Sequence, residues 1–195
     1  ARAMHPDRAA VQEVLHLAAQ RIDQLARAVE READHVDHRV GRQLAHALAE
    51  RAGRLLALVE GSGAHEIDPR SLATLGRFDF GGALDTLKGG MVAHPKIEHG
   101  TSTIYTFGYW GARGGLTYHV FGADGRQRVS RDIETPYPAM MHDFSVTETR
   151  AIFYHLPAVL HMDDMKSPNT IRWEPSRGAR IGVVLRDDPA APVRW

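Results

Sequence analysis

Residues 103–133 read TIYTFGYWGARGGLTYHVFGADGRQRVSRDI, and this stretch indicates a β fold. It contains three runs rich in β-branched and aromatic residues, which are typical of strands: Thr103–Tyr109, Leu116–Phe121 and Gln127–Ile133. Ala123-Asp124-Gly125 stands between the last two runs, and Asp-Gly is a strong signal for a hairpin turn. The stretch therefore predicts short strands joined by tight turns.

Further strand candidates flank this stretch on both sides. Arg54–Glu60 is an apolar run followed by Gly-Ser-Gly, and Ile181–Leu185 is the last clear candidate. Ala139–Thr147 and Ala151–Leu156 form another candidate pair, joined around residues 148–150. Short strands separated by Gly- and Pro-rich turns are typical of a sandwich, a barrel or a propeller.

Residues 1–52 have a different composition, with one Gly, one Pro and no aromatic residue. Their apolar residues recur at alternating spacings of four and three: Val11, Leu15, Ala18, Ile22, Leu25 and Val29. This period predicts an amphipathic α-helical N-terminal segment over 1–52, distinct from the β region 53–195. Because a single apolar stripe needs a partner, the segment packs either on the rest of the chain or on another copy, which would be self-association through 1–52.

The overall composition excludes several classes of protein. The 195 residues include 24 basic and 24 acidic side chains, so neither nucleic acid nor an anionic membrane is expected as the main partner. No cysteine is present, which excludes disulfides and thiolate metal sites. No apolar run reaches the roughly 18 residues of a transmembrane segment, and the first residues lack the apolar core of a signal peptide. A cytoplasmic location is the expectation.

The 12 histidines leave imidazole as the natural metal ligand. His94 precedes Pro95, which favours an extended backbone, and His142 stands in a strand-like run. Either one alone reads more readily as a hydrogen-bonded histidine in the protein interior. Glu32, His35 and His38 share one face of the predicted helix, but a solvated polar face is the better interpretation there.

Four strings, in order, resemble the carotenoid cleavage oxygenase family, also called the retinal pigment epithelial membrane protein family. They are LLALVEG followed by HEIDPRSLATLGRFDFGG (55–61 and 65–82), MVAHPKIEHGTSTIYTFGY (91–109), PAMMHDFSVTETRAIFYHLP (138–157) and IRWEPSRGARIGVVLRDD (171–188). The resemblance covers about residues 53–195, and the AHPK and MMHDF strings are its most specific parts.

The resemblance implies a seven-bladed β-propeller with an iron(II) on its axis, held by four histidines and supported by three glutamates. It assigns His94 and His142 as the first two iron ligands, and Glu60 as a carboxylate that holds the outer nitrogen of a ligand histidine. It also implies cleavage of a conjugated C=C bond by O2 to give two carbonyl products. Phe144, Met140 and Met141 would then contact an apolar polyene or serve as ordinary core.

The sequence also departs from the family pattern. The third and fourth histidine ligands of the family lie downstream of the string that ends at Trp195, so the expectation is an incomplete part of the propeller and an incomplete iron site. The stilbene-cleaving branch carries a Lys directly before the glutamate, whereas this chain has Val59, which favours a carotenoid or apocarotenoid substrate.

These observations lead to competing interpretations. The first is a truncated or partial iron(II) dioxygenase whose chain is inactive on its own. The alternative is a catalytically inactive β module fused to a helical oligomerisation segment. A further alternative assigns residues 1–52 to a shifted reading frame.

Overall fold

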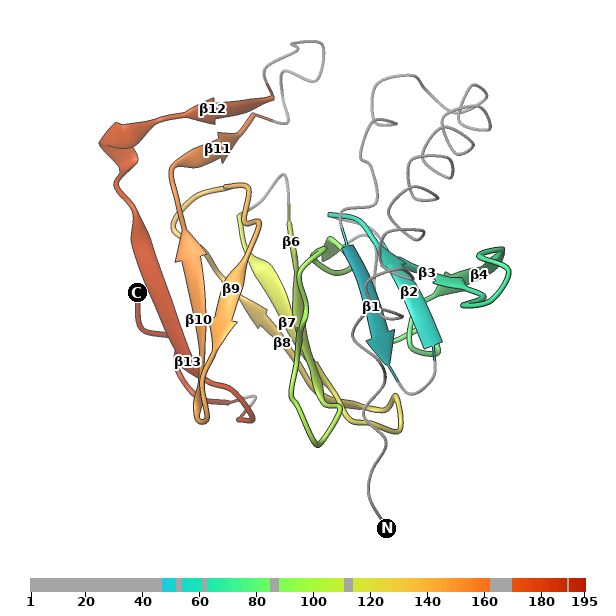
Figure 1. Cartoon of the computed structure of the whole chain (residues 1–195). Coiled ribbons are helices and arrows are strands. Elements are labelled where there is room, and N and C mark those ends of the chain that lie inside the picture. The colour runs from blue at the N-terminus through green and yellow to red at the C-terminus, as the bar shows by residue number, and fades with distance from the viewer. Residues whose placement is uncertain are drawn as a thin grey trace, which may run out of the picture.

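The computed structural model describes residues 47–51, 54–60, 63–84, 88–110, 114–161, 170–188 and 190–195. These residues form three antiparallel sheets, which stand in chain order across the molecule, and a separate two-stranded hairpin (Figure 1). The expectation of a mainly β protein is therefore confirmed. The seven-bladed ring remains a prediction.

The first sheet is a meander in the order β1 (Ala47–Arg51), β2 (Arg54–Leu58), β3 (Ala64–Ile67) and β4 (Thr74–Phe78). The helix predicted over residues 1–52 is wrong at Ala47–Arg51. These residues form β1, which pairs with β2 along its whole length. Ala, Leu and Glu are good helix formers, but pairing satisfies the backbone groups along one edge of β2, and such tertiary pairing overrides local propensity. Residues 1–46 of the predicted segment lie outside the described residues.

The central sheet contains β5 (Lys96–Ile97), β6 (Ile104–Tyr109), β7 (Leu116–Phe121) and β8 (Gln127–Ile133), again in chain order. The three strands predicted over 103–133 are confirmed to within one residue at their ends, and so is the hairpin between β7 and β8. Gly125 in that hairpin has φ 80°, which suits glycine. Strand β7 is buried at all six positions, as expected for a sheet covered on both faces.

The third sheet is built from β9 (Phe144–Val146), β10 (Arg150–His155) and β13 (Arg180–Leu185). Arg194 exchanges two backbone hydrogen bonds with Val183 on the free edge of β13, so the sheet gains a fourth partner there. The strand predicted over Ala139–Thr147 is much shorter than expected. The predicted pairing of β9 with β10 is confirmed.

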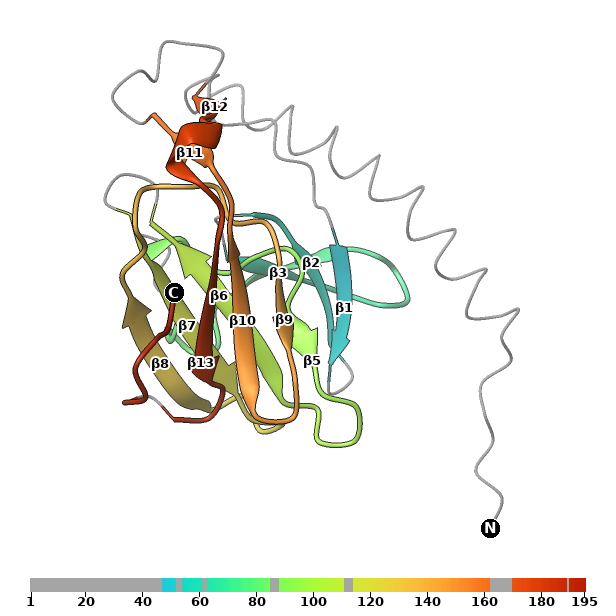
Figure 2. The same cartoon turned by 90° about the vertical axis from the view of Figure 1, so that its left-hand side faces the viewer.

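A hairpin interrupts the third sheet between β10 and β13. It consists of β11 (Ala158–Leu160) and β12 (Ile171–Trp173), and a short 3-10 helix at Pro175–Arg177 leads from it into β13. The hairpin projects beyond the three sheets in both views (Figures 1 and 2). Strand β12 is exposed at all three positions, Trp173 at 64%, whereas Val159 of β11 is buried against Tyr137 and Ala139.

Two hydrophobic clusters join the three sheets. One packs the central sheet against the third, with Tyr105, Phe107 and Tyr118 facing Phe144 and Phe153. The other packs the central sheet against the first, through Leu56, Leu58, Ile104 and Phe121 among others. Side-by-side antiparallel meanders held together by face-to-face packing are the arrangement of propeller blades.

Candidate metal centre

Three polar side chains meet where the three sheets come together. Glu60 follows the end of β2 by two residues, while His94 and His142 precede β5 and β9 by two residues each. One ligand atom from each residue lies within 4.8 Å of the others. Strands β5 and β9 also lie side by side in Figure 2. Each sheet thus contributes one residue to the cluster.

The two imidazoles point their Nε2 atoms at each other. The Nε2–Nε2 distance is 3.0 Å, and the rings are edge-on, with centroids 4.6 Å apart and an interplanar angle of 74°. Two nitrogens bound at right angles to one ion, at about 2.1 Å each, would be separated by about 3.0 Å. His94 is half-buried and His142 is exposed, so the pair is open to an incoming ion.

Glu60 holds both histidine-bearing segments. Its Oε1 accepts a hydrogen bond of 3.0 Å from the backbone N–H of Ala93 and lies 3.4 Å from His142 Nδ1. The residue is only 4% exposed, and its Oε2 is buried without a hydrogen-bond partner. Burial raises the pKa of Glu60 to about 7, which the Ala93 N–H opposes and the nearby Asp143 charge reinforces.

The position of Glu60 decides what it can do. It approaches the Nδ1 side of His142, whereas His94 approaches the Nε2 side. A carboxylate at Nδ1 fixes the tautomer and the ring angle and leaves the Nε2 lone pair free for a metal. An ion bound between the two Nε2 atoms would therefore be held by the two imidazoles. Glu60 would contact the His142 ring at Nδ1, on the side away from the ion.

Local backbone packing places His94. The segment before it crosses directly over β6, where a Cβ at Gly89 would lie 2.3 Å from the Tyr109 carbonyl oxygen and one at Gly108 would lie 2.7 Å from backbone atoms of residues 88–90. The N–H of Val92 then donates to the Phe107 carbonyl at 2.8 Å. Both glycines are required by this close approach, which fixes the backbone up to Val92, two residues before His94.

The apolar residues near the site divide into two groups. Met141 and Phe144 are 1% exposed and belong to the core, which favours the packing interpretation for them, while Met140 is half-buried. Tyr109 is half-buried, and burial together with the Glu60 charge raises its pKa to about 12, so the phenol stays protonated.

An ion pair that sequence reasoning missed flanks the histidines. Lys96 Nζ lies 2.6 Å from Asp143 Oδ1. Lys96 follows His94 by two residues and Asp143 follows His142 by one, so the sequence shows a charge near each histidine but nothing that joins the two charges. The alternative cluster of Glu32, His35 and His38 lies outside the described residues.

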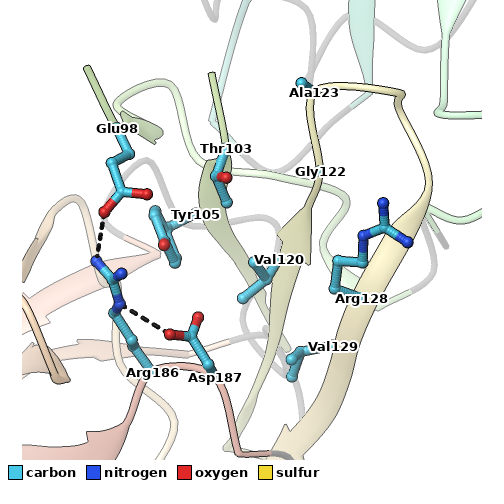
Figure 3. Close-up of a pocket in the computed structure, with 10 residues that line it drawn as sticks. All are labelled: Glu98, Thr103, Tyr105, Val120, Gly122, Ala123, Arg128, Val129, Arg186 and Asp187. Atoms are coloured by element: carbon cyan, nitrogen blue, oxygen red, sulfur yellow. Dashed lines mark hydrogen bonds and ion pairs between the residues drawn. The ribbon is translucent and has the colours of Figure 1, made fainter. Parts of the chain in front are cut away.

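A separate pocket lies elsewhere on the central sheet. Its volume is about 480 Å³, and residues of the β5–β6 loop, β6, β7, β8 and the end of β13 line it (Figure 3). Arg186 lies on one side of it, with Nη1 2.9 Å from Glu98 Oε1 and Nε 3.0 Å from Asp187 Oδ2. Arg128 on its rim pairs with Asp124. Each arginine that lines the pocket is therefore paired with a carboxylate.

The described part of the chain contains no helix with the length and apolar character needed to cross a bilayer.

Comparison with known proteins gives consistent matches. The family model described as retinal pigment epithelial membrane protein matches residues 7–195. Isoeugenol monooxygenase of Pseudomonas nitroreducens is 35% identical over 148 residues, which is 73% of this chain and 30% of the relative. Carotenoid 9,10(9',10')-cleavage dioxygenase 1 of Arabidopsis thaliana is 35% identical over 155 residues, 76% of this chain and 28% of the relative.

Solved structures agree with the sequence matches. Lignostilbene dioxygenase of Pseudomonas brassicacearum superposes with a TM-score of 0.70 at 31% identity, covering 76% of this chain and 31% of that one. A variant of the Synechocystis apocarotenoid oxygenase gives a TM-score of 0.65 at 26% identity, covering 75% and 33%. The chain thus spans about a third of the length of the proteins it matches.

Proposed function

The chain belongs to the retinal pigment epithelial membrane protein family, and from this premise we propose that it forms part of a non-haem iron(II) dioxygenase. The reaction is cleavage of a conjugated C=C bond by O2. Both bonds of the alkene break and each carbon receives one oxygen atom, so two carbonyl products form and no external reductant is needed. The observation that carries the proposal is the convergence of the His94 and His142 Nε2 atoms with Glu60 behind His142.

The donor set fits iron(II). Imidazole nitrogen is a suitable ligand for iron, and two neutral imidazoles leave the ion its full charge. When bound, iron(II) would activate O2. His94 and His142 would bind the iron, and Glu60 Oε1, which lies 3.4 Å from His142 Nδ1, would accept the N–H there so that Nε2 stays unprotonated.

The substrate class follows from the residue before Glu60 and from the relatives. Val59 is half-buried and apolar, and it offers no charge to a phenol, so we propose a carotenoid or apocarotenoid polyene. A second candidate is an alkene conjugated to an aromatic ring, because the relatives include an isoeugenol monooxygenase and a lignostilbene dioxygenase. Both candidates require the same bond cleavage.

One experiment tests the function. The full chain is loaded with Fe(II) under anaerobic conditions and mixed with O2 and either an apocarotenal or isoeugenol, and the aldehydes are measured by chromatography. Aldehyde from the apocarotenal supports the polyene proposal, and aldehyde from isoeugenol alone supports the second candidate.

The inactive β module remains the competing interpretation. We expect Fe(II) to bind weakly through His94 and His142, and His94→Ala or His142→Ala to remove that binding. Absence of any histidine-dependent Fe(II) binding, together with absence of aldehyde, would favour the inactive module.

A further inference from the structure

The ion pair between Lys96 and Asp143 stands directly beside the two histidines. Lys96 begins β5, the edge strand of the central sheet, and Asp143 precedes β9, the edge strand of the third sheet. The Nζ–Oδ1 distance is 2.6 Å, and the side chains are 33% and 48% exposed. The pair therefore ties together the two segments in which His94 and His142 lie, just before β5 and β9.

These two strands belong to different sheets, so no backbone ladder sets their separation. The distance between the two Nε2 atoms must then depend on side-chain contacts, both those of Glu60 with the Ala93 N–H and His142 and those between the central and third sheets. Those contacts include the edge-on pair of Phe107 and Phe144, with ring centroids 5.2 Å apart. Lys96–Asp143 adds an ion pair within two residues of each histidine.

Both ends of the ion pair are anchored. Asp143 Oδ1 also accepts the backbone N–H of Phe144 at 2.8 Å, which fixes the carboxylate against its own strand. The Lys96 ammonium lies 5.6 Å from the centroid of the Phe144 ring, and Phe144 is 1% exposed. A cation over an aromatic face is attracted to it, so Lys96 is held by two contacts rather than one.

We propose that Lys96 and Asp143 are positioning residues, whose ion pair holds the His94 and His142 rings at the separation a shared metal ion needs. The inference rests on the proposed function, because it assumes that His94 and His142 bind a metal ion. The pairing also cancels the ammonium charge, so a cation arriving at the imidazoles does not meet an unneutralised positive neighbour.

The chain offers a matched control for this pair. Lys88 Nζ lies 2.7 Å from Asp132 Oδ2, with side chains 47% and 46% exposed, and its two residues are not adjacent to either histidine in the sequence. Exposed ion pairs of this kind contribute little to stability. If Lys96–Asp143 is merely another surface pair, its removal should resemble the removal of Lys88.

The test uses the full chain with labelled histidine and two readouts. The first is the nuclear Overhauser effect between the His94 and His142 rings without metal, and the second is Co(II) affinity with the visible Co(II) spectrum. We expect Lys96→Met and Asp143→Asn to weaken the ring–ring effect, to lower Co(II) affinity about tenfold or more, and to change the spectrum. Lys96→Arg should restore both readouts, and Lys88→Met should change neither.

Two results would overturn the inference. One is a parent chain without a ring–ring effect, and the other is Lys96→Met and Asp143→Asn variants that keep both the ring–ring effect and the parent Co(II) affinity. A parent chain that shows the ring–ring effect but binds no Co(II) contradicts the proposed metal-dependent function instead. The metal-free readout still decides in that case whether the ion pair sets the ring separation.

Discussion

The two faces of the central sheet differ in chemistry, although alternate residues of the same strands, β6 and β7, build both. Toward the third sheet these strands present large aromatic rings, including Phe107 and Tyr118. Toward the first sheet they present polar side chains that are at most 4% exposed: Thr106, Thr117 and His119. One face is an interlocked aromatic layer, whereas the other combines these buried polar side chains with the apolar Ile104 and Phe121.

The difference indicates what each interface is suited to do. On the aromatic face, Phe107, Phe144 and Phe153 contact one another with centroids 5.2 to 5.9 Å apart, and such a layer has few alternative packings. The histidine pair stands at the edge of this face. On the polar face, Thr117 accepts from Trp110 and donates to Asp132. We therefore expect the polar face to make stability depend on pH, and the aromatic face to fix how the central and third sheets are placed.

The largest predicted effect comes from removing a ring from the aromatic layer. Phe153→Ala should lower the free energy of unfolding by about 4 kcal/mol, because Phe153 is fully buried between three aromatic rings. Chemical denaturation measures the loss. The matched control is Phe121→Ala on the other face, where Phe121 stacks on Phe80 at 3.9 Å. Both variants should lose stability, but only Phe153→Ala should disturb the histidine rings, and an equal disturbance in both would contradict the comparison.

The second effect is a pH dependence specific to the polar face. Burial lowers the pKa of His119 to about 4, and Gln127 Nε2 lies 3.1 Å from its Nδ1. In the unfolded chain the imidazole takes up a proton below its usual pKa, near 6.5, whereas in the folded protein it stays neutral until about pH 4. Stability is therefore lost as the pH falls from 6.5 to 4, by at most about 3 kcal/mol.

The measurement for His119 is unfolding at several pH values in the parent and in His119→Gln. The variant should lose less stability than the parent between pH 6.5 and 4, because it lacks the titrating ring. Parallel curves for the two proteins would mean that His119 is not held neutral.

The third predicted effect comes from the place where the backbone of residues 88–90 crosses β6. Gly108→Ala should cost about 2 kcal/mol, because its Cβ would meet backbone atoms that cannot move aside. Gly122→Ala is the control, since its Cβ would meet only the side-chain ends of Arg128 and Asp124. Thermal unfolding compares the two, and a cost at Gly122 equal to that at Gly108 would show that the crossing is not tight.

The smallest effect has the opposite sign. Thr106 is 0% exposed and its hydroxyl has no hydrogen-bond partner, so Thr106→Val should stabilise the fold by about 1 kcal/mol. Thr117→Val should destabilise by about the same amount, because that hydroxyl makes two hydrogen bonds. Denaturation midpoints measure both. A loss of stability in Thr106→Val would show that the hydroxyl is satisfied.

The sequence allowed the central sheet to be predicted better than the sheets beside it. The strands of residues 103–133 are long, rich in β-branched and aromatic residues and joined by a recognisable turn, so local signals were enough. Strand β1 was not predicted, because its sequence ALAER favours a helix and only its pairing with β2 makes it a strand. Strands β11 and β12 have three residues each, too few for a periodic signal.

The candidate site could be predicted only in part. His94 and His142 are 48 residues apart in the sequence, and spacing alone gives no reason for their rings to meet. The resemblance named them together with Glu60, and these three residues do lie together. Lys96 and Asp143 were missed because a charge pair between two sheets has no local pattern.

The hairpin between β10 and β13 has a consequence for the order of folding. Residues 156–179 separate two strands that must pair, whereas β6, β7 and β8 follow one another through short connections. Pairing across a long loop is slow because the loop must close first. We therefore expect β13 to join the third sheet last. Because β9 pairs with β10 through a short turn, a metal ion added during refolding can meet both His94 and His142 before β13 has paired.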